Sequence, residues 1–192
     1  MICNLNYEKC NQHSAKFVII GGGTVGLVMA KKLAELNIGA VAVLELGGKQ
    51  VTLARDAFPE VIFSRSIYEG ADAGRFAGLG GTSARWGGAM IPFLTSDFVG
   101  QFKAVITEAC GYTEEIERIF SLSKGPYIDD NSLVVPGYVT RKAKWPRFTK
   151  RNLASLYAKE IKSSGNLVVY THAKVVGFEE LSQGQISILA EN

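Results

Sequence analysis

Two glycine-rich turns, far apart in the sequence, limit what this chain can fold into. The first, Gly21–Gly26, directly follows the apolar run Phe17–Ile20, and the second spans Gly78–Gly88. A short apolar run that ends in glycines is typical of a strand buried on both faces. Because glycines let backbone N–H groups approach an anion closely, the pair of turns predicts a long anionic ligand held in two places.

The residues after the first turn predict a strand–helix–strand unit. Thr24–Asn37 carries small and apolar residues at helical spacing, and Asn37 and Gly39 provide an end for that helix. Val41–Glu45 is a second apolar run that finishes in an acid. We therefore expect an α/β fold whose strands are parallel and joined by a right-handed crossover.

The first turn has the features of a pyrophosphate site. A helix N-terminus presents free N–H groups and a partial positive charge. In this pattern Gly21 permits the tight turn, Gly23 the close approach of phosphate, and Gly26 the packing of helix on strand. Glu45, nineteen residues after Gly26, offers a carboxylate to both ribose hydroxyls and would repel a 2′-phosphate. The pattern predicts a dinucleotide and disfavours NADP, but it does not separate FAD from NAD.

The second turn combines bare backbone, hydroxyl groups and an aromatic ring. Its glycines can adopt positive φ and direct N–H groups at an anion or let backbone approach a ring system. Its hydroxyls can bind phosphate or flavin oxygens, and its indole can form a flat wall beside an isoalloxazine. These residues are Gly80, Gly81, Thr82, Ser83, Trp86, Gly87 and Gly88.

The stretch Leu79–Pro92 resembles the flavin-proximal motif of the glucose–methanol–choline (GMC) oxidoreductases and their sugar-oxidising relatives. Similar patches occur at Leu44–Gly48, Asp97-Phe98, Glu115–Phe120, Lys144–Pro146 and Arg151–Leu153, so the resemblance covers most of Phe17–Glu179. It implies a Rossmann-like FAD-binding fold with a central parallel sheet and a small β-hairpin lobe, truncated relative to the family. Residues 1–16 are then an N-terminal tail, and 17–192 an incomplete FAD-binding domain without the C-terminal substrate domain.

The resemblance also implies how the cofactor is held. Arg85 stands where some relatives carry a flavin-linked His, which implies non-covalent FAD. His172–Phe178 resembles a strand that binds adenine through its backbone, with Val175 as the contact. The expected cofactor-binding residues are Gly21, Gly23, Thr24, Val25, Gly26, Glu45, Leu46, Gly80, Gly81, Thr82, Ser83, Trp86, Gly87, Gly88 and Val175.

No catalytic residue can be assigned from the sequence. The family's base is a His in its C-terminal portion, whereas His13 and His172 match no such position. We expect the FAD-binding portion of an oxidoreductase that acts on CH–OH groups of a sugar or other alcohol, inactive alone. One alternative is a non-catalytic dinucleotide-binding fragment or subunit that requires a partner chain. Another is an NAD-binding enzyme, against which the second glycine turn argues.

Composition excludes several other classes of protein. A net charge of +3 is too small to indicate a nucleic-acid partner, and no apolar run is long enough for a membrane span. The basic run Arg141–Arg151 is interpreted as a solvated loop, with a phosphate or acidic-sugar contact as the alternative. Cys3, Cys10 and Cys110 lack the spacing of a metal site. We expect a reduced, cytoplasmic setting.

Overall fold

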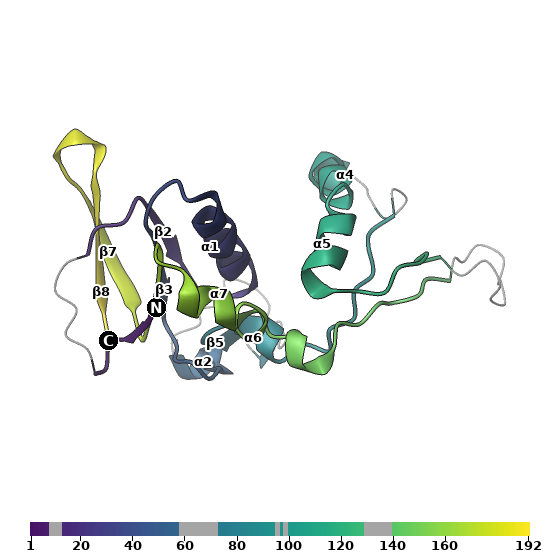
Figure 1. Ribbon diagram of the computed structural model, residues 1–192, viewed down its shortest axis with the longest axis horizontal. Coiled ribbons are helices and arrows are strands. Elements are labelled where there is room, and N and C mark those ends of the chain that lie inside the picture. The colour runs from purple at the N-terminus through teal and green to yellow at the C-terminus, as the bar shows by residue number, and fades with distance from the viewer. Residues whose placement is uncertain (8–12, 58–72, 95–96, 98–99, 129–139) are drawn as a thin grey trace. The chain divides into compact units, whose positions relative to one another are not determined.

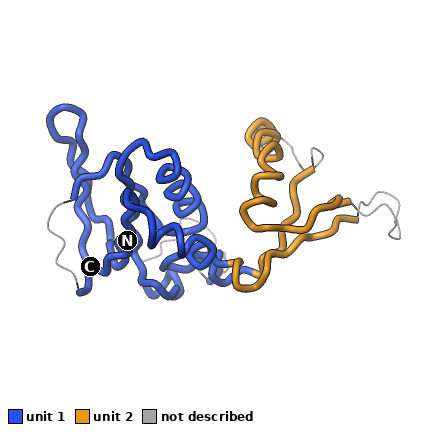
Figure 2. The backbone as a smooth tube through the Cα atoms, in the orientation of Figure 1, with its two compact units in different colours: residues 1–86, 152–192 blue, residues 87–151 orange. Residues whose placement is uncertain are grey.

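The computed structural model describes the 192-residue chain except residues 8–12, 58–72, 95–96, 98–99 and 129–139. It divides into two compact units (Figure 2). Unit 1 comprises residues 1–86 and 152–192, and unit 2 comprises residues 87–151. Unit 1 is therefore assembled from two stretches of chain that are separated in sequence by the whole of unit 2.

A four-stranded parallel sheet forms the centre of unit 1 (Figure 1). Its strands lie in the order β1 (Ile2–Asn4), β6 (Leu167–Thr171), β3 (Val41–Glu45) and β2 (Phe17–Ile20). Each neighbouring pair is parallel. Val43 and Val169, on the two central strands, are fully buried. The predicted α/β fold with a central parallel sheet is confirmed.

Three helices cover one face of this sheet. Helix α1 (Thr24–Leu36) follows β2 and buries Leu27 and Ala30, while α6 (Leu153–Leu156) and α7 (Ala158–Ser163) pack beside it. The sequence predicts a single helix over Asn152–Ser163. The chain instead leaves helical geometry at Tyr157, with φ −101° and ψ 13°, so two short helices replace one.

A β-hairpin lies on the opposite side of the sheet from α1 (Figure 1). Its strands are β7 (Lys174–Glu180) and β8 (Ile186–Glu191), joined through a 3₁₀ turn at Ser182–Gly184. Ala190 of β8 packs against a buried cluster that includes Ala42 and Tyr170. The predicted small hairpin lobe is confirmed.

The first residues of the chain differ from the expected tail. Ile2–Asn4 forms β1 and pairs with β6, and the ammonium group of Met1 donates to the carbonyl oxygens of Ile161 at 2.8 Å and Leu167 at 2.9 Å. A strand of three residues is too short to produce a periodic pattern. The formation of β1 therefore depends on its pairing with β6, which lies far away in the sequence.

Short elements connect the sheet to the second glycine turn. Strands β4 (Thr52–Leu53) and β5 (Phe76–Ala77) form an antiparallel pair, and helix α2 (Ala54–Ala57) follows β4. The turn begins directly after β5 and includes the 3₁₀ segment Gly81–Ala84. The position of β5 therefore determines where the second turn starts.

Unit 2 contains the helices α4 (Lys103–Cys110) and α5 (Thr113–Phe120). The sequence of Ser96–Cys110 is compatible with a helix, but α4 covers only its second half, and a 3₁₀ turn at Gly100–Phe102 precedes α4. Part of Ser96–Cys110 lies outside the described residues. So does most of Gly125–Tyr138, where two prolines and two glycines predict a loop. Helix α5 ends where Ser121 adopts a left-handed conformation with φ 52°.

The basic run Arg141–Arg151 in unit 2 contains a buried lysine. Lys144 is 6% exposed, forms an ion pair with Glu117, and lies 3.9 Å from the centre of the Tyr127 ring. The hydrogen bond from Lys144, aided by one from Tyr127, lowers the pKa of Glu117. Burial, together with the hydrogen bond to Glu117, raises the pKa of Tyr127 to about 12. Part of the basic run is thus packed rather than solvated.

We predict that Glu117→Gln lowers the pKa of Tyr127 from about 12 toward, but not to, its ordinary value of 10.0, because burial persists when the charge is lost. In the wild type, the raised pKa stabilises the folded state fully below the unfolded pKa, and this contribution is lost as pH rises through the folded pKa. NMR titration of the ring measures both proteins. Glu115→Gln, which removes a carboxylate paired with Arg118, is the control. If the pKa of Tyr127 stays at about 12 in Glu117→Gln, Glu117 does not contribute to raising it, and the prediction is wrong.

Candidate functional site

The first glycine turn leaves the N-terminus of α1 without a side-chain cap. Gly21 has φ +100°, a conformation that glycine adopts readily, and its N–H donates to the carbonyl oxygen of Leu44 at 2.7 Å. The N-cap residue is Gly23, around which a Cβ atom would meet nothing within 4 Å. Since the first N–H groups of a helix have no intrahelical partner, this end of α1 can accept an anion.

The second turn lies directly against the first. The N–H of Gly80 donates to the carbonyl oxygen of Gly22 at 2.8 Å. A Cβ on Gly81 would be 3.0 Å from the Cα of Gly23 and 3.9 Å from the backbone nitrogen of Thr24. Gly80 and Gly81 both have positive φ, as expected for a turn that brings its backbone close to another chain segment. The two turns thus meet at the start of α1.

The carboxylate of Glu45 ties the two turns to the end of β3. Its Oε2 accepts the N–H of Gly22 at 2.7 Å, and its Oε1 accepts those of Gly47 at 2.9 Å and Gly78 at 2.7 Å. Glu45 is only 5% exposed. A buried carboxylate needs such donors because each hydrogen bond compensates for lost hydration. Three separate backbone segments are therefore held by one side chain.

The second turn is also fixed to the start of α6. Ser83 Oγ donates to the carbonyl oxygen of Gly80 at 2.6 Å and accepts the N–H of Leu153 at 3.1 Å. Asn152 caps α6 by accepting the N–H of Ala154, and its Oδ1 would lie 1.9 Å from a Cβ at Gly80. A side chain at Gly80 is therefore excluded by both its φ and its neighbour.

The predicted residues in the two turns divide into exposed and engaged groups. Thr24, Val25 and Thr82 are exposed, and the hydroxyl and N–H of Thr82 have no hydrogen-bond partner among the described residues. Ser83 is buried and already uses its hydroxyl within the fold. Trp86 and Leu46 are half-buried. The exposed groups remain available to a ligand.

Three predicted residues lie away from the joined turns or in unit 2. Val175 is half-buried on β7 and pairs with Ala190. Gly87 and Gly88 belong to unit 2, where Gly88 has φ +80° and packs against the side chain of Arg151. Their contacts with a cofactor stay predictions.

The structure adds backbone and capping residues that sequence reasoning did not include in the site. These are Gly22, Gly47, Gly78 and Asn152. The three glycines fall in Gly-rich stretches, which was the available signal, but their shared partner is visible only in three dimensions. His172 also lies here, between β6 and β7, with φ 57° and its N–H donating to Gly47. It supports the turn through its backbone.

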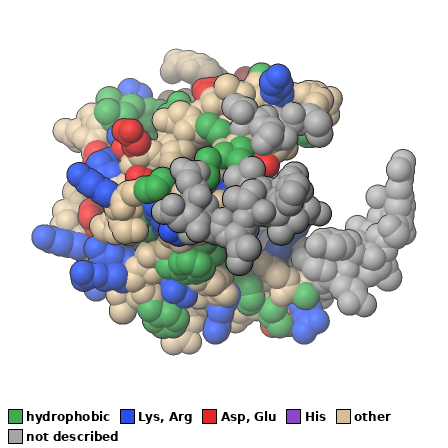
Figure 3. Space-filling view, turned by 90° about the vertical axis from the view of Figure 1, so that its right-hand side faces the viewer, with side chains coloured by type: hydrophobic (Ala, Val, Ile, Leu, Met, Phe, Trp, Pro, Cys, Tyr) green, Lys and Arg blue, Asp and Glu red, His purple; other side chains and the backbone are tan. Residues whose placement is uncertain are grey.

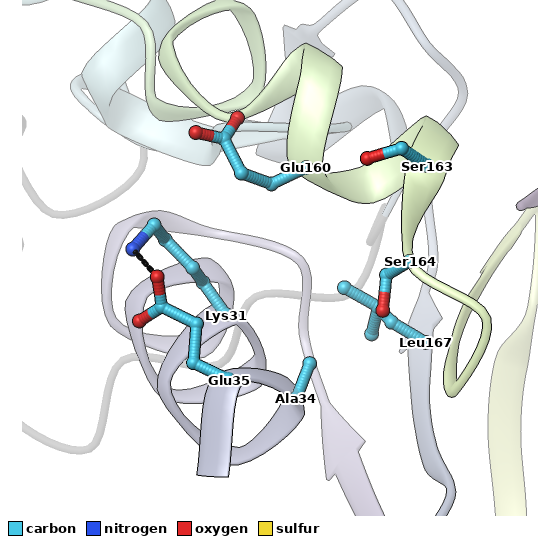
Figure 4. Close-up of a pocket in the computed structure, with 7 residues that line it drawn as sticks. All are labelled: Lys31, Ala34, Glu35, Glu160, Ser163, Ser164 and Leu167. Atoms are coloured by element: carbon cyan, nitrogen blue, oxygen red, sulfur yellow. Dashed lines mark hydrogen bonds and ion pairs between the residues drawn. The ribbon is translucent and has the colours of Figure 1, made fainter. Parts of the chain in front are cut away.

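Other features of the described surface do not form a competing site. A hollow of about 230 Å³ between α1 and α7 is lined by Lys31, Glu35 and Glu160, but Lys31 is already paired with Glu35 at 2.6 Å (Figure 4). Basic side chains on the face in Figure 3 are interspersed with apolar and acidic ones. Among the described residues, no helix has the length and apolar character needed to cross a membrane.

The fold is similar to that of a known GMC oxidoreductase, so the resemblance drawn from the motifs is confirmed at the level of the fold. Pyridoxine 4-oxidase from Mesorbium loti, a GMC oxidoreductase, superposes with a TM-score of 0.52 and 16% sequence identity. The match covers 92% of this chain and 48% of that one, so this chain spans about half the length of the enzyme.

Sequence comparison gives short matches of the same class. A stretch of 32 residues, 17% of this chain, is 56% identical to patulin synthase of Penicillium expansum. A stretch of the same length is 59% identical to patulin synthase of Aspergillus clavatus. These matches cover 5% of each patulin synthase. No protein-family model matches the sequence.

We predict that Gly26→Ala destabilises unit 1, because its Cβ would be 2.0 Å from the carbonyl oxygen of Gly21. Overpacking against backbone typically costs about 1–3 kcal/mol. Gly23→Ala is the matched control, since a Cβ there meets nothing within 4 Å and its φ of −77° suits any residue. Urea denaturation measures both variants. Equal midpoints for the two would show that the turn is not packed as described.

Proposed function

We propose that unit 1 binds FAD non-covalently across the joined turns, as the FAD-binding portion of an oxidoreductase. Its substrate is a sugar or another small alcohol, oxidised at a CH–OH group. The observation that carries the proposal is the contact between the two glycine turns at the N-terminus of α1. A diphosphate binds best where N–H donors approach it from more than one side, and two turns that meet at a helix N-terminus can supply such donors.

The residues present fit such a cofactor. The N–H groups at the start of α1 and the N–H and hydroxyl of Thr82 are donors for phosphate oxygens, and the open space at Gly23 admits close approach. Glu45 supplies a carboxylate for ribose, and Trp86 an apolar surface for the flavin ring. Gly21, Val25, Gly26, Leu46, Gly80 and Gly81 shape the backbone, and Val175 offers main-chain groups to adenine. When bound, FAD supplies the hydride acceptor.

We propose that the base for the alcohol proton comes from a second half of the enzyme, in the same polypeptide or a partner chain. The chain spans 48% of pyridoxine 4-oxidase, and neither of its histidines matches the position of the family's base. The N–H of His172 donates to the carbonyl oxygen of Gly47, and the ring of His13 lies tilted at 5.6 Å from that of Tyr170. The chain alone therefore binds the cofactor without turning over an alcohol.

The outer edge of strand β2 supports the proposal that a second half of the enzyme packs against this chain. Phe17 and Gly21 donate their N–H groups to the carbonyl oxygens of Ala40 and Leu44 on the β3 side. Because backbone groups alternate along a strand, those of Val18 and Ile20 point to the free edge of β2. Their side chains are 40% and 53% exposed. An apolar edge that no described residue pairs with is a site where another strand can add.

The first prediction of this proposal concerns the cofactor. Purified chain should show flavin absorption after incubation with FAD and separation from free FAD. Gly23→Ala should weaken FAD binding at least about tenfold without loss of stability, since a methyl group would occupy the approach to the helix N-terminus. Gly165→Ala, where a Cβ also meets nothing within 4 Å, is the control. A colourless protein that binds NAD instead would overturn the proposal.

The second prediction concerns the sheet edge. The chain without its second half should self-associate, and Val18→Lys should reduce the associated fraction, because a charge at an edge strand opposes pairing. Size-exclusion chromatography with light scattering measures both. Val105→Lys on α4, at a side chain that is 64% exposed, is the matched control. A wild-type chain that stays monomeric at all concentrations would argue against an open edge.

A further inference from the structure

We infer that Glu45 is a positioning residue: its carboxylate holds the second glycine turn against the first, so that both act as a single site. This inference rests on the proposed FAD function for its binding test but not for its structural one. Glu45 was expected from the sequence only as a partner of ribose. The three-dimensional arrangement gives it a second task that precedes any ligand.

The geometry of the carboxylate carries the inference. Its donors, Gly22, Gly47 and Gly78, come from the turn after β2, the turn after β3 and the turn after β5. Both carboxylate oxygens are used, at distances of 2.7 to 2.9 Å, and the side chain is 5% exposed. Hydrogen bonds to an ionised acceptor are roughly twice as strong as neutral ones. The carboxylate is therefore the strongest link between these turns.

The number of acceptor positions limits what remains for a ligand. A carboxylate offers about four lone-pair sites, two on each oxygen. Gly47 and Gly78 occupy both sites of Oε1, and Gly22 occupies one of Oε2. One site is left, so Glu45 can accept a single ribose hydroxyl rather than two. Most of its hydrogen-bonding capacity serves the protein.

A glutamine cannot replace this arrangement. Its amide has one acceptor oxygen, and its NH₂ group would face an N–H donor on the other side. Glu45→Gln therefore leaves at least one buried N–H without a partner. The neutral links Gly80 to Gly22 and Leu79 to Gly48 persist, at 2.8 and 3.0 Å, so the turns loosen without the sheet unfolding.

The structural test uses the chain without ligand. In Glu45→Gln, hydrogen–deuterium exchange should accelerate at least about tenfold at the N–H of Gly80 and at that of Gly22 or Gly78, whichever faces the new NH₂ group, while Val43 and Val169 keep their protection. Glu35→Gln, which removes a carboxylate from the surface pair with Lys31, is the matched control and should change none of these rates. Unchanged exchange at Gly22, Gly78 and Gly80 in Glu45→Gln would overturn the inference.

The binding test separates positioning from ribose contact. Thr82→Val removes an exposed hydroxyl on the second turn, and its effect on the FAD dissociation constant is measured with and without Glu45→Gln. If Glu45 positions the turn, the several-fold effect of Thr82→Val should vanish when Glu45 is already replaced. If Glu45 contacts only ribose, the two effects multiply, and the inference fails.

The outcomes of the two proposals can be told apart. If no variant and no wild-type chain binds FAD, the proposed function fails, yet the exchange experiment still decides the role of Glu45. If Glu45→Gln does not fold, hydrogen–deuterium exchange of the wild-type chain tests the inference instead. The N–H of Gly78 should then be protected to the same degree as that of Gly22, because one carboxylate holds both. Exchange of Gly78 at the rate of an open loop would contradict the inference.

Discussion

The hydrogen bonds between the Glu45 carboxylate and three backbone N–H groups are the interaction on which the rest of the site depends. Burying a carboxylate is unfavourable unless donors replace its water, and here all of the donors come from turns. Because loss of any one donor would leave the buried carboxylate of Glu45 less well solvated, the positions of these turns depend on one another. Because Glu45 ends β3, a central strand, the parallel sheet determines where both turns lie. Fold and candidate site are thus connected by one side chain.

The second turn also marks where the chain leaves unit 1 and returns to it. Unit 2 is inserted between Trp86 and Asn152, so that it begins within the glycine-rich stretch Gly78–Gly88 and ends just before the N-cap of α6. Within unit 1, the hydrogen bond from Leu153 to Ser83 and the close packing of Asn152 on Gly80 join the two stretches of chain that flank the insertion. Unit 2 has its own internal support in the contacts of Lys144 with Glu117 and Tyr127.

Local patterns could be predicted from the sequence, and contacts across long stretches of chain could not. The strand, turn and helix from Phe17 to Leu36 follow from apolar runs and glycines, and all three elements are found. The acid at Glu45 was expected, but not its bond to Gly78, 33 residues away. Likewise Lys144 lay in a run interpreted as solvated, because its partner Glu117 is 27 residues earlier. The strand β1 and the break at Tyr157 depend on packing that no window of sequence contains.

A crystal structure of the chain grown with FAD tests the central claim most directly. The account predicts one diphosphate within hydrogen-bond distance of N–H groups from both turns, those at the start of α1 and that of Thr82, with Glu45 still bound to Gly22 and Gly78. A nucleotide that touches only one turn, or that lies elsewhere on unit 1, would contradict it.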